Sequence, residues 1–152
     1  MSRQPRGFTP WVKWEDRKGK FTHMERPGVY AIAESNKEPK AVSEWPRQII
    51  YIGMTHAKGG LKSRLHDFDY AIRNGHGHSG GNRVFAAIGK RGYSKFVKNL
   101  YVSVLQYKCE VASPEPNDLR TIGDIRKQEY KCFACFMEKH KELPRHNRLD
   151  SR

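Results

Sequence analysis

"GVYAIAE" at residues 28–34 and "RQIIYIGM" at residues 47–54 are the two runs of sequence that decide the fold. The first alternates in polarity, which is typical of a strand with two different faces. The second is almost continuously apolar, which is typical of a strand buried on both faces. Residues 35–46 between them hold two prolines and several turn formers. We therefore expect an antiparallel hairpin with a long loop.

Each run of the hairpin carries one tyrosine and one glycine. On neighbouring strands, Tyr30 and Tyr51 can lie side by side on one face of the sheet. Gly28 and Gly53 would then leave backbone open near them, where a bulky ligand could approach. The pair predicts one site rather than two unrelated core tyrosines.

The rest of the chain predicts helices around this hairpin. Residues 61–74 have apolar residues at helical spacing and end at Gly75. "HGHSGG" at 76–81 reads as a flexible loop, residues 82–91 as a short helix and residues 98–108 as a third strand. Asp118 is a good N-cap for a long helix that Pro144 stops.

The order of these elements is β-β-α-α-β-α. It predicts an α/β (α+β) fold with a small three-stranded antiparallel sheet flanked by helices. We expect a single domain over residues 27–152. Residues 1–26 are expected to form a basic N-terminal arm, either irregular or a short edge strand, with Trp11 and Trp14 packed onto the domain.

Charge limits the classes of function. The 152 residues carry a formal charge of +13, which points to a polyanionic partner, with DNA first and an acidic membrane surface second. No apolar run approaches the ~18 residues of a membrane span, and no signal sequence is recognisable at the N-terminus. The three cysteines are an odd number, which fits a reducing compartment. We expect a cytoplasmic or nucleoid-associated protein that is not secreted.

The tripeptides "GVY" (28–30) and "YIG" (51–53) introduce a series of ordered motifs. "GLKSRL" then places Arg64 on the next helix, and "GHSGGNRVFAAIGKRGYSKFVKNLYVSVL" is followed by a long helix with glutamates and by "LPRHN", which ends at Asn147. This order resembles the GIY-YIG endonuclease family over residues 27–147. The long loops are closer to its restriction and homing members than to its repair nickases.

The resemblance implies hydrolysis of a phosphodiester bond with one divalent metal, leaving a 5′-phosphate and a 3′-hydroxyl. It implies that Arg64 clamps the phosphate, that Tyr30 and Tyr51 orient or deprotonate the attacking water, and that Asn147 belongs to the catalytic set. Mg²⁺, with Mn²⁺ as an alternative, suits a site with a single carboxylate because it keeps most of its waters. No small-molecule cofactor is expected.

The metal-binding glutamate is a choice between Glu129 and Glu138. At ~100° per residue, Glu129 lies in the middle of the apolar stripe of the long helix, whereas Glu138 lies on the opposite side with lysines. A carboxylate facing a core is costly unless a charged group meets it, and a metal would do so. We predict Glu129, with Glu138 as the alternative.

Other candidates are weaker. Family members often have a His or Tyr one turn after the arginine, but this chain has Phe68 there, and His66 is our first candidate for that role, with Tyr70, Lys62 and His56 as others. "CFAC" at 132–135 could contribute to a zinc site, although it lies within a predicted helix. The residues expected to contact nucleic acid are Lys58, Lys62, Arg73, His78, Arg83, Lys90, Arg91 and Lys95.

These expectations amount to a Mg²⁺-dependent DNA endonuclease, which would act as a homodimer if it cuts both strands. Its runner-up is a non-catalytic basic nucleic-acid-binding module of the same fold, which the missing aromatic or histidine after Arg64 would favour. A structure-specific nickase, or a version acting on RNA, is the third reading.

Overall fold

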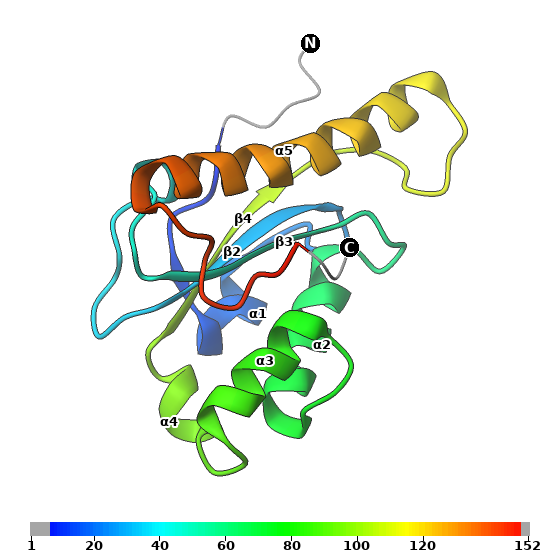
Figure 1. Ribbon diagram of the computed structural model, residues 1–152. Coiled ribbons are helices and arrows are strands. Elements are labelled where there is room, and N and C mark those ends of the chain that lie inside the picture. The colour runs from blue at the N-terminus through cyan, green and yellow to red at the C-terminus, as the bar shows by residue number, and fades with distance from the viewer. Residues whose placement is uncertain (1–6, 150–152) are drawn as a thin grey trace.

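A four-stranded antiparallel sheet lies at the centre of the computed structural model, which describes residues 7–149 (Figure 1). Its strands are β1 (Val12–Lys13), β2 (Gly28–Glu34), β3 (Ile49–Thr55) and β4 (Leu100–Gln106), in the order β1-β4-β2-β3. The predicted mixed fold and its three strands are present, and the N-terminal segment adds the fourth. β2 pairs with both β3 and β4, so the strand that carries Tyr30 is the interior one.

Helices cover both faces of the sheet (Figure 1). The helix α5 (Pro116–His140) lies on one face, and α2 (Gly60–Asn74), α3 (Ser79–Ile88) and the short α4 (Tyr93–Val97) lie on the other. Each face has its own apolar core: Tyr30, Tyr51 and Phe68 belong to the α2 side, and Ala31 and Ile52 to the α5 side. Adjacent residues of β2 therefore serve different cores, as the alternation of a strand requires.

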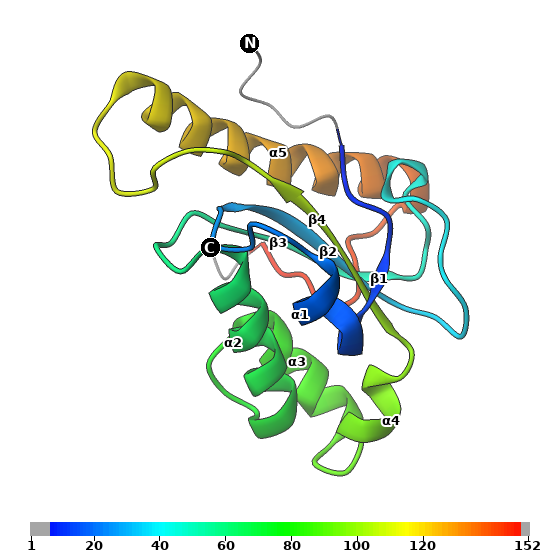
Figure 2. The same ribbon diagram turned by 180° about the vertical axis from the view of Figure 1, so that it is seen from behind.

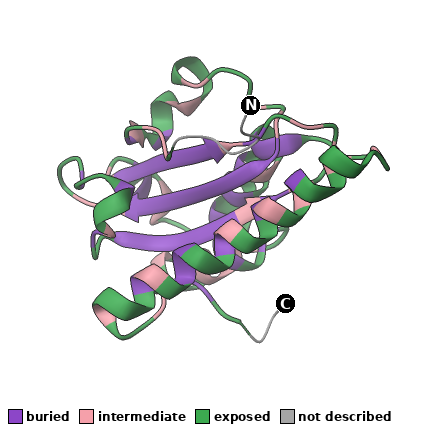
Figure 3. Ribbon diagram, turned by 90° about the horizontal axis from the view of Figure 1, so that it is seen from above, coloured by how far each residue is buried: buried purple, intermediate pink, exposed green. Residues whose placement is uncertain are grey.

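The long helix confirms the predicted apolar stripe. Ile125, Cys132 and Phe136 are buried on one side of α5, and Figure 3 shows buried positions recurring along it between exposed ones. The predicted N-cap at Asp118 is wrong. The N-cap is Glu115 and the helix begins at Pro116, three residues before the predicted start, because the fixed φ of proline suits the first helical turn. Asp118 instead accepts a hydrogen bond from the backbone N–H of Glu110 at 3.1 Å.

The loop predicted over residues 76–81 is partly helical. His78 is the N-cap of α3, whose first residues are Ser79, Gly80 and Gly81. The glycines concealed this helix because glycine is a poor helix former. They are needed for packing: a Cβ on Gly81 would lie 2.6 Å from the Cβ of Ala71 in α2.

The N-terminal segment belongs to the folded unit from residue 7 onward (Figure 2). β1 pairs with β4, a 3-10 turn (Trp14–Asp16) and α1 (Arg17–Lys20) follow, and Trp14 is 1% exposed. The Trp14 indole donates to Asp69 at 2.8 Å, and Arg17 lies 4.0 Å from the same carboxylate. Trp11 and Trp14 pack onto the domain as expected, so neither ring is free to stack on a base. Residues 1–6 of the predicted arm lie outside the described part of the chain.

Candidate functional site

Tyr30 and Tyr51 form one buried pair on the α2 face of the sheet. Their ring centroids are 6.1 Å apart, and the register places Tyr51 opposite Ile32 and Tyr30 opposite Gly53, so the two tyrosines are diagonal neighbours. Both are almost completely buried. The predicted pairing is therefore present, but neither ring faces solvent.

We expected the two glycines to leave space for a ligand, but neighbouring atoms fill the space beside each of them. A Cβ on Gly53 would lie 2.5 Å from the Tyr30 hydroxyl oxygen, because the phenol of Tyr30 covers that glycine. A Cβ on Gly28 would meet the backbone carbonyl of Leu105 on β4 at 2.1 Å. Gly53 makes room for Tyr30, and Gly28 allows β2 and β4 to pair closely.

His78 is the residue that the sequence placed wrongly. It was expected at a nucleic-acid surface, but it is 3% exposed and lies between Tyr51 and Phe68, with ring centroids 5.5 and 5.2 Å away. Its Nε2 is 2.9 Å from the hydroxyl of Tyr30. The one clue in the sequence was its position in the loop just ahead of the helix predicted from residue 82.

The hydrogen bonds of His78 define which ring nitrogen carries the proton. The backbone N–H of Gly81 points at Nδ1, 3.2 Å away, and an N–H can only donate. Nδ1 is therefore the acceptor, and the proton of the neutral ring is on Nε2. The Nε2–H accordingly donates to the oxygen of Tyr30.

Arg64 reaches the same tyrosine from α2. It hydrogen-bonds to the Tyr30 hydroxyl and its charge lowers the pKa of that group. Burial is the larger influence, and together with the neighbouring Tyr51 it raises the pKa of Tyr30 well above its ordinary value. Tyr30 is therefore a neutral phenol at physiological pH, which argues against its acting as the base.

Arg64 also lines an open cleft. Met54, Thr55, His56 and Asp67 share with it a cleft of ≈ 280 Å³ between the end of β3 and the start of α2. Arg64 is half-buried, so its side chain connects the buried Tyr30 to this solvent-facing space. Of Tyr30, Tyr51 and Arg64, it is the one that lines this cleft.

The two candidate glutamates lie where the helix pattern predicted. Glu129 is 1% exposed within the apolar side of α5, and Glu138 is exposed. Although α5 covers the opposite face of the sheet from α2, the charge of Glu129 contributes to raising the pKa of Tyr30. The Glu129 carboxylate is thus electrostatically coupled to the tyrosine.

Within residues 7–149, no three His, Cys, Asp or Glu side chains gather as a metal-binding group. The arrangement offers nothing for zinc, which takes several side-chain ligands, and Cys132 is buried inside α5. One hard carboxylate, such as that of Glu129, is the type of side-chain ligand that Mg²⁺ takes.

Asn147 has a structural position. Its side-chain oxygen accepts from the backbone N–H of Ile52 at 2.9 Å, and its amide donates to the carbonyl of Ile52 at 2.8 Å. The backbone N–H of His146 donates to the carbonyl of Ile50, so this segment covers the edge of β3 beside Tyr51. Both polar ends of the Asn147 side chain are engaged with the backbone of Ile52, so this side chain holds the C-terminal segment against β3.

His66 is not brought to the tyrosines. It is exposed on the other side of α2, where it lines a separate cleft with Phe21 and Met24. His66 therefore does not take the role predicted for it, and His78, the N-cap of α3, lies beside Tyr30.

Two predicted nucleic-acid contacts have internal partners. Arg73 pairs with Asp69 at 3.0 Å and lies over the ring of Tyr93, and the guanidinium of Arg83 donates to the carbonyl of His146 at 2.7 Å. Arg73 thus links α2 to α4, and Arg83 links α3 to the C-terminal segment. Arg83 is half-buried, whereas Arg73 remains exposed despite its partners. The other predicted basic residues with exposed side chains are Lys58, Lys62, Lys90, Arg91 and Lys95.

The chain was compared with protein-family models, with curated proteins and with solved structures, and none of them matches it. No helix in the described residues is long and apolar enough to cross a membrane.

Proposed function

We propose that this protein is a DNA endonuclease that binds the scissile phosphate through Arg64. The observation that carries the proposal is that Tyr30, Tyr51 and Arg64 meet from three separate elements. Of these three residues, Arg64 is the one that lines the open cleft beside them. A guanidinium is always charged and can hold two phosphate oxygens. The charge of +13 supplies the long-range attraction for DNA.

In this proposal Tyr30 is a positioning residue. It is completely buried and remains a phenol, so it acts on the substrate through Arg64 and not by contact. The Tyr30 hydroxyl oxygen accepts hydrogen bonds from Arg64 and from the His78 Nε2–H, so the hydroxyl proton points to neither of these two groups. This replaces the expectation that a tyrosine deprotonates water.

His56 is the better candidate for the base, because it lines the cleft that Arg64 lines. An imidazole accepts a proton near neutral pH, whereas a phenol does so poorly. His56 would take a proton from the water as the water oxygen bonds to phosphorus. The bond from phosphorus to O3′ would break and O3′ would take a proton from solvent water, leaving a 5′-phosphate and a 3′-hydroxyl. Arg64 would neutralise the charge that grows on the phosphate oxygens.

Glu129 would hold the divalent metal in this scheme. A bound Mg²⁺ would supply Lewis-acid stabilisation of the phosphate. The support for Glu129 is its place on the buried side of α5 and the contribution of its charge to the raised pKa of Tyr30.

A non-catalytic DNA-binding module is the second candidate. The specific observation in its favour is the burial of both tyrosines, together with the raised pKa of Tyr30. Such a module would keep the salt-dependent affinity for DNA and lack hydrolysis.

Cleavage of supercoiled plasmid at low salt with Mg²⁺ tests the proposal. We expect Arg64→Ala and Glu129→Gln each to lower the rate by roughly 100-fold or more. Glu138→Gln is the matched control, because it changes an exposed glutamate on the same helix and should leave the rate unchanged. A wild-type protein that binds DNA but does not cut plasmid, branched DNA or RNA would be the binding module.

A further inference from the structure

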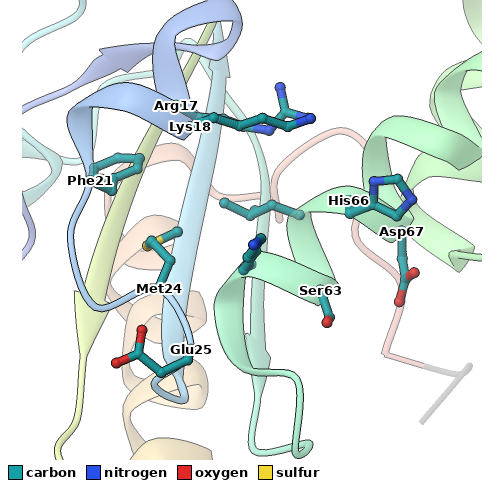
Figure 4. Close-up of a pocket in the computed structure, with 10 residues that line it drawn as sticks. Arg17, Lys18, Phe21, Met24, Glu25, Ser63, His66 and Asp67 are labelled. Carbon is teal, nitrogen blue, oxygen red and sulfur yellow. The ribbon is translucent and has the colours of Figure 1, made fainter.

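A second cleft lies beside the first turns of α2 (Figure 4). It measures ≈ 610 Å³ and runs between α1 with its following loop and α2. Phe21 and Met24 line it from the loop, and Leu65 lines it from α2. Both loop residues are half-buried against the α2-side core, so the apolar part of the cleft is built into the fold.

Cations surround this apolar surface. In Figure 4, Arg17 and Lys18 extend across the cleft from α1, and Lys62 lines it from the first turn of α2. Arg17 is held in place because it donates to the carbonyl of Trp14 at 3.0 Å and lies 4.3 Å over the Trp14 ring. The Arg17 guanidinium is thus engaged with Trp14 and Asp69, whereas the side chains of Lys18 and Lys62 are exposed at the cleft.

The rim also carries groups that can accept hydrogen bonds. Glu25, Ser63, His66 and Asp67 are among the residues that line the cleft, and each has a side chain that can accept a hydrogen bond. A site for phosphate alone would not need these carboxylates or an apolar surface. A site for a purely apolar ligand would not need the cations.

The two clefts share a wall. Ser63 and Asp67 line both this cleft and the one that contains Arg64. A strand whose phosphate lies against Arg64 therefore has a neighbouring nucleotide within reach of the cleft between α1 and α2.

We propose that the α1–α2 cleft binds one nucleotide of the DNA strand held by Arg64, with its base against Phe21 and its phosphate against Lys18 and Lys62. The proposal deepens the proposed function and rests on it. A nucleotide combines an apolar ring face, polar edge groups and a negative charge, which is the combination that this cleft offers. Its volume lies within the range of small-molecule sites.

The first arm of the test measures phosphate contact. Fluorescence anisotropy with a labelled single strand in EDTA reports affinity without cleavage. Lys18→Ala combined with Lys62→Ala should weaken binding roughly tenfold and lower the salt slope by about 1.5. Lys127→Ala combined with Lys131→Ala removes the same charge from exposed positions on α5 and should have a much smaller effect.

The second arm measures base contact. A strand with normal bases is compared with an equally charged strand of abasic residues. The wild type should prefer the normal strand by roughly fivefold or more, and Phe21→Leu should lose most of that preference. Phe21→Tyr keeps an aromatic ring and should retain it, which separates stacking from a folding defect.

Each outcome decides the proposal. Equal losses of affinity in the two lysine pairs would overturn the nucleotide site. A Phe21→Leu variant that still prefers normal bases would also overturn it, because the cleft would then bind phosphate only. Absence of strand binding by the wild type would overturn both proposals. Binding that depends on the cleft, in a protein that does not cut, would refute the nuclease and keep the nucleotide site.

Discussion

Two substitutions at His78 separate its structural role from its role at Tyr30. The ring accepts the N–H of Gly81 at Nδ1 and donates from Nε2 to Tyr30. Asparagine places an acceptor where Nδ1 stands and has no atom that reaches Tyr30. Glutamine places an amide donor near the Nε2 position and leaves the helix without its side-chain cap.

The expected sizes follow from these bonds. A hydrogen bond between neutral groups is worth about 1 kcal/mol, so His78→Asn should slow cleavage about fivefold if Tyr30 remains a phenol. If Tyr30 became negatively charged in the transition state, the bond would be worth roughly 1.5–3 kcal/mol and the loss would be roughly 10- to 150-fold. The raised pKa of Tyr30 favours the smaller loss.

His78→Gln should behave in the opposite way. Loss of the cap should reduce the free energy of unfolding by about 1 kcal/mol. The cleavage rate of the folded variant should stay within about twofold of the wild type, because a donor to Tyr30 remains. Single-turnover nicking of plasmid gives the rates, and urea unfolding gives the stabilities.

Two results would refute this reasoning. If both variants lost activity equally, the cap and not the bond to Tyr30 would matter. If His78→Asn lost roughly 10- to 150-fold, Tyr30 would be an ionised participant and the assignment of a neutral phenol would be wrong.

Three further predictions concern the scaffold, each measured by urea unfolding. Gly53→Ala should destabilise the fold by about 2 kcal/mol, because the added Cβ would lie 2.5 Å from the Tyr30 hydroxyl oxygen. Gly123→Ala, in open space on α5, should stabilise it by roughly 0.5–1 kcal/mol. An equal effect at both sites would refute the packing argument. Asn147→Asp should lower the free energy of unfolding by roughly 2–3 kcal/mol at pH 7, since it replaces the donor to the Ile52 carbonyl with a negative oxygen. An unchanged stability would show that this pairing does not hold the edge of β3. Burial, followed by the charges of Arg145, Arg83 and Arg148, lowers the pKa of His146 to about 4, so the unfolded chain binds a proton first as pH falls. Stability should therefore drop by up to about 3 kcal/mol between pH 6.5 and 4, and His146→Phe should reduce that drop; an unchanged pH profile would contradict the assignment.

Much of the fold was predictable because it depends on local periodicity. The hairpin of β2 and β3, the extent of α2 and the buried side of α5 followed from spacing alone. β1 was harder to predict, because two residues carry no period, and it is β4 that gives them strand partners. The first turn of α3 was hidden by its glycines, which only the packing against Tyr51 and α2 explains.

The candidate site shows the same division. The sequence by itself determined which residue types were present: the two tyrosines in adjacent strands, an arginine on the next helix, a glutamate in an apolar stripe and a large positive charge. These follow from patterns within single elements. Only the tertiary structure decided that His78 and not His66 meets Tyr30, that Asn147 is bound to the backbone of β3, and that Arg64 alone of its cluster lines the open cleft. Those contacts join residues distant in the chain, and their geometry depends on how helices and strands pack across the whole domain.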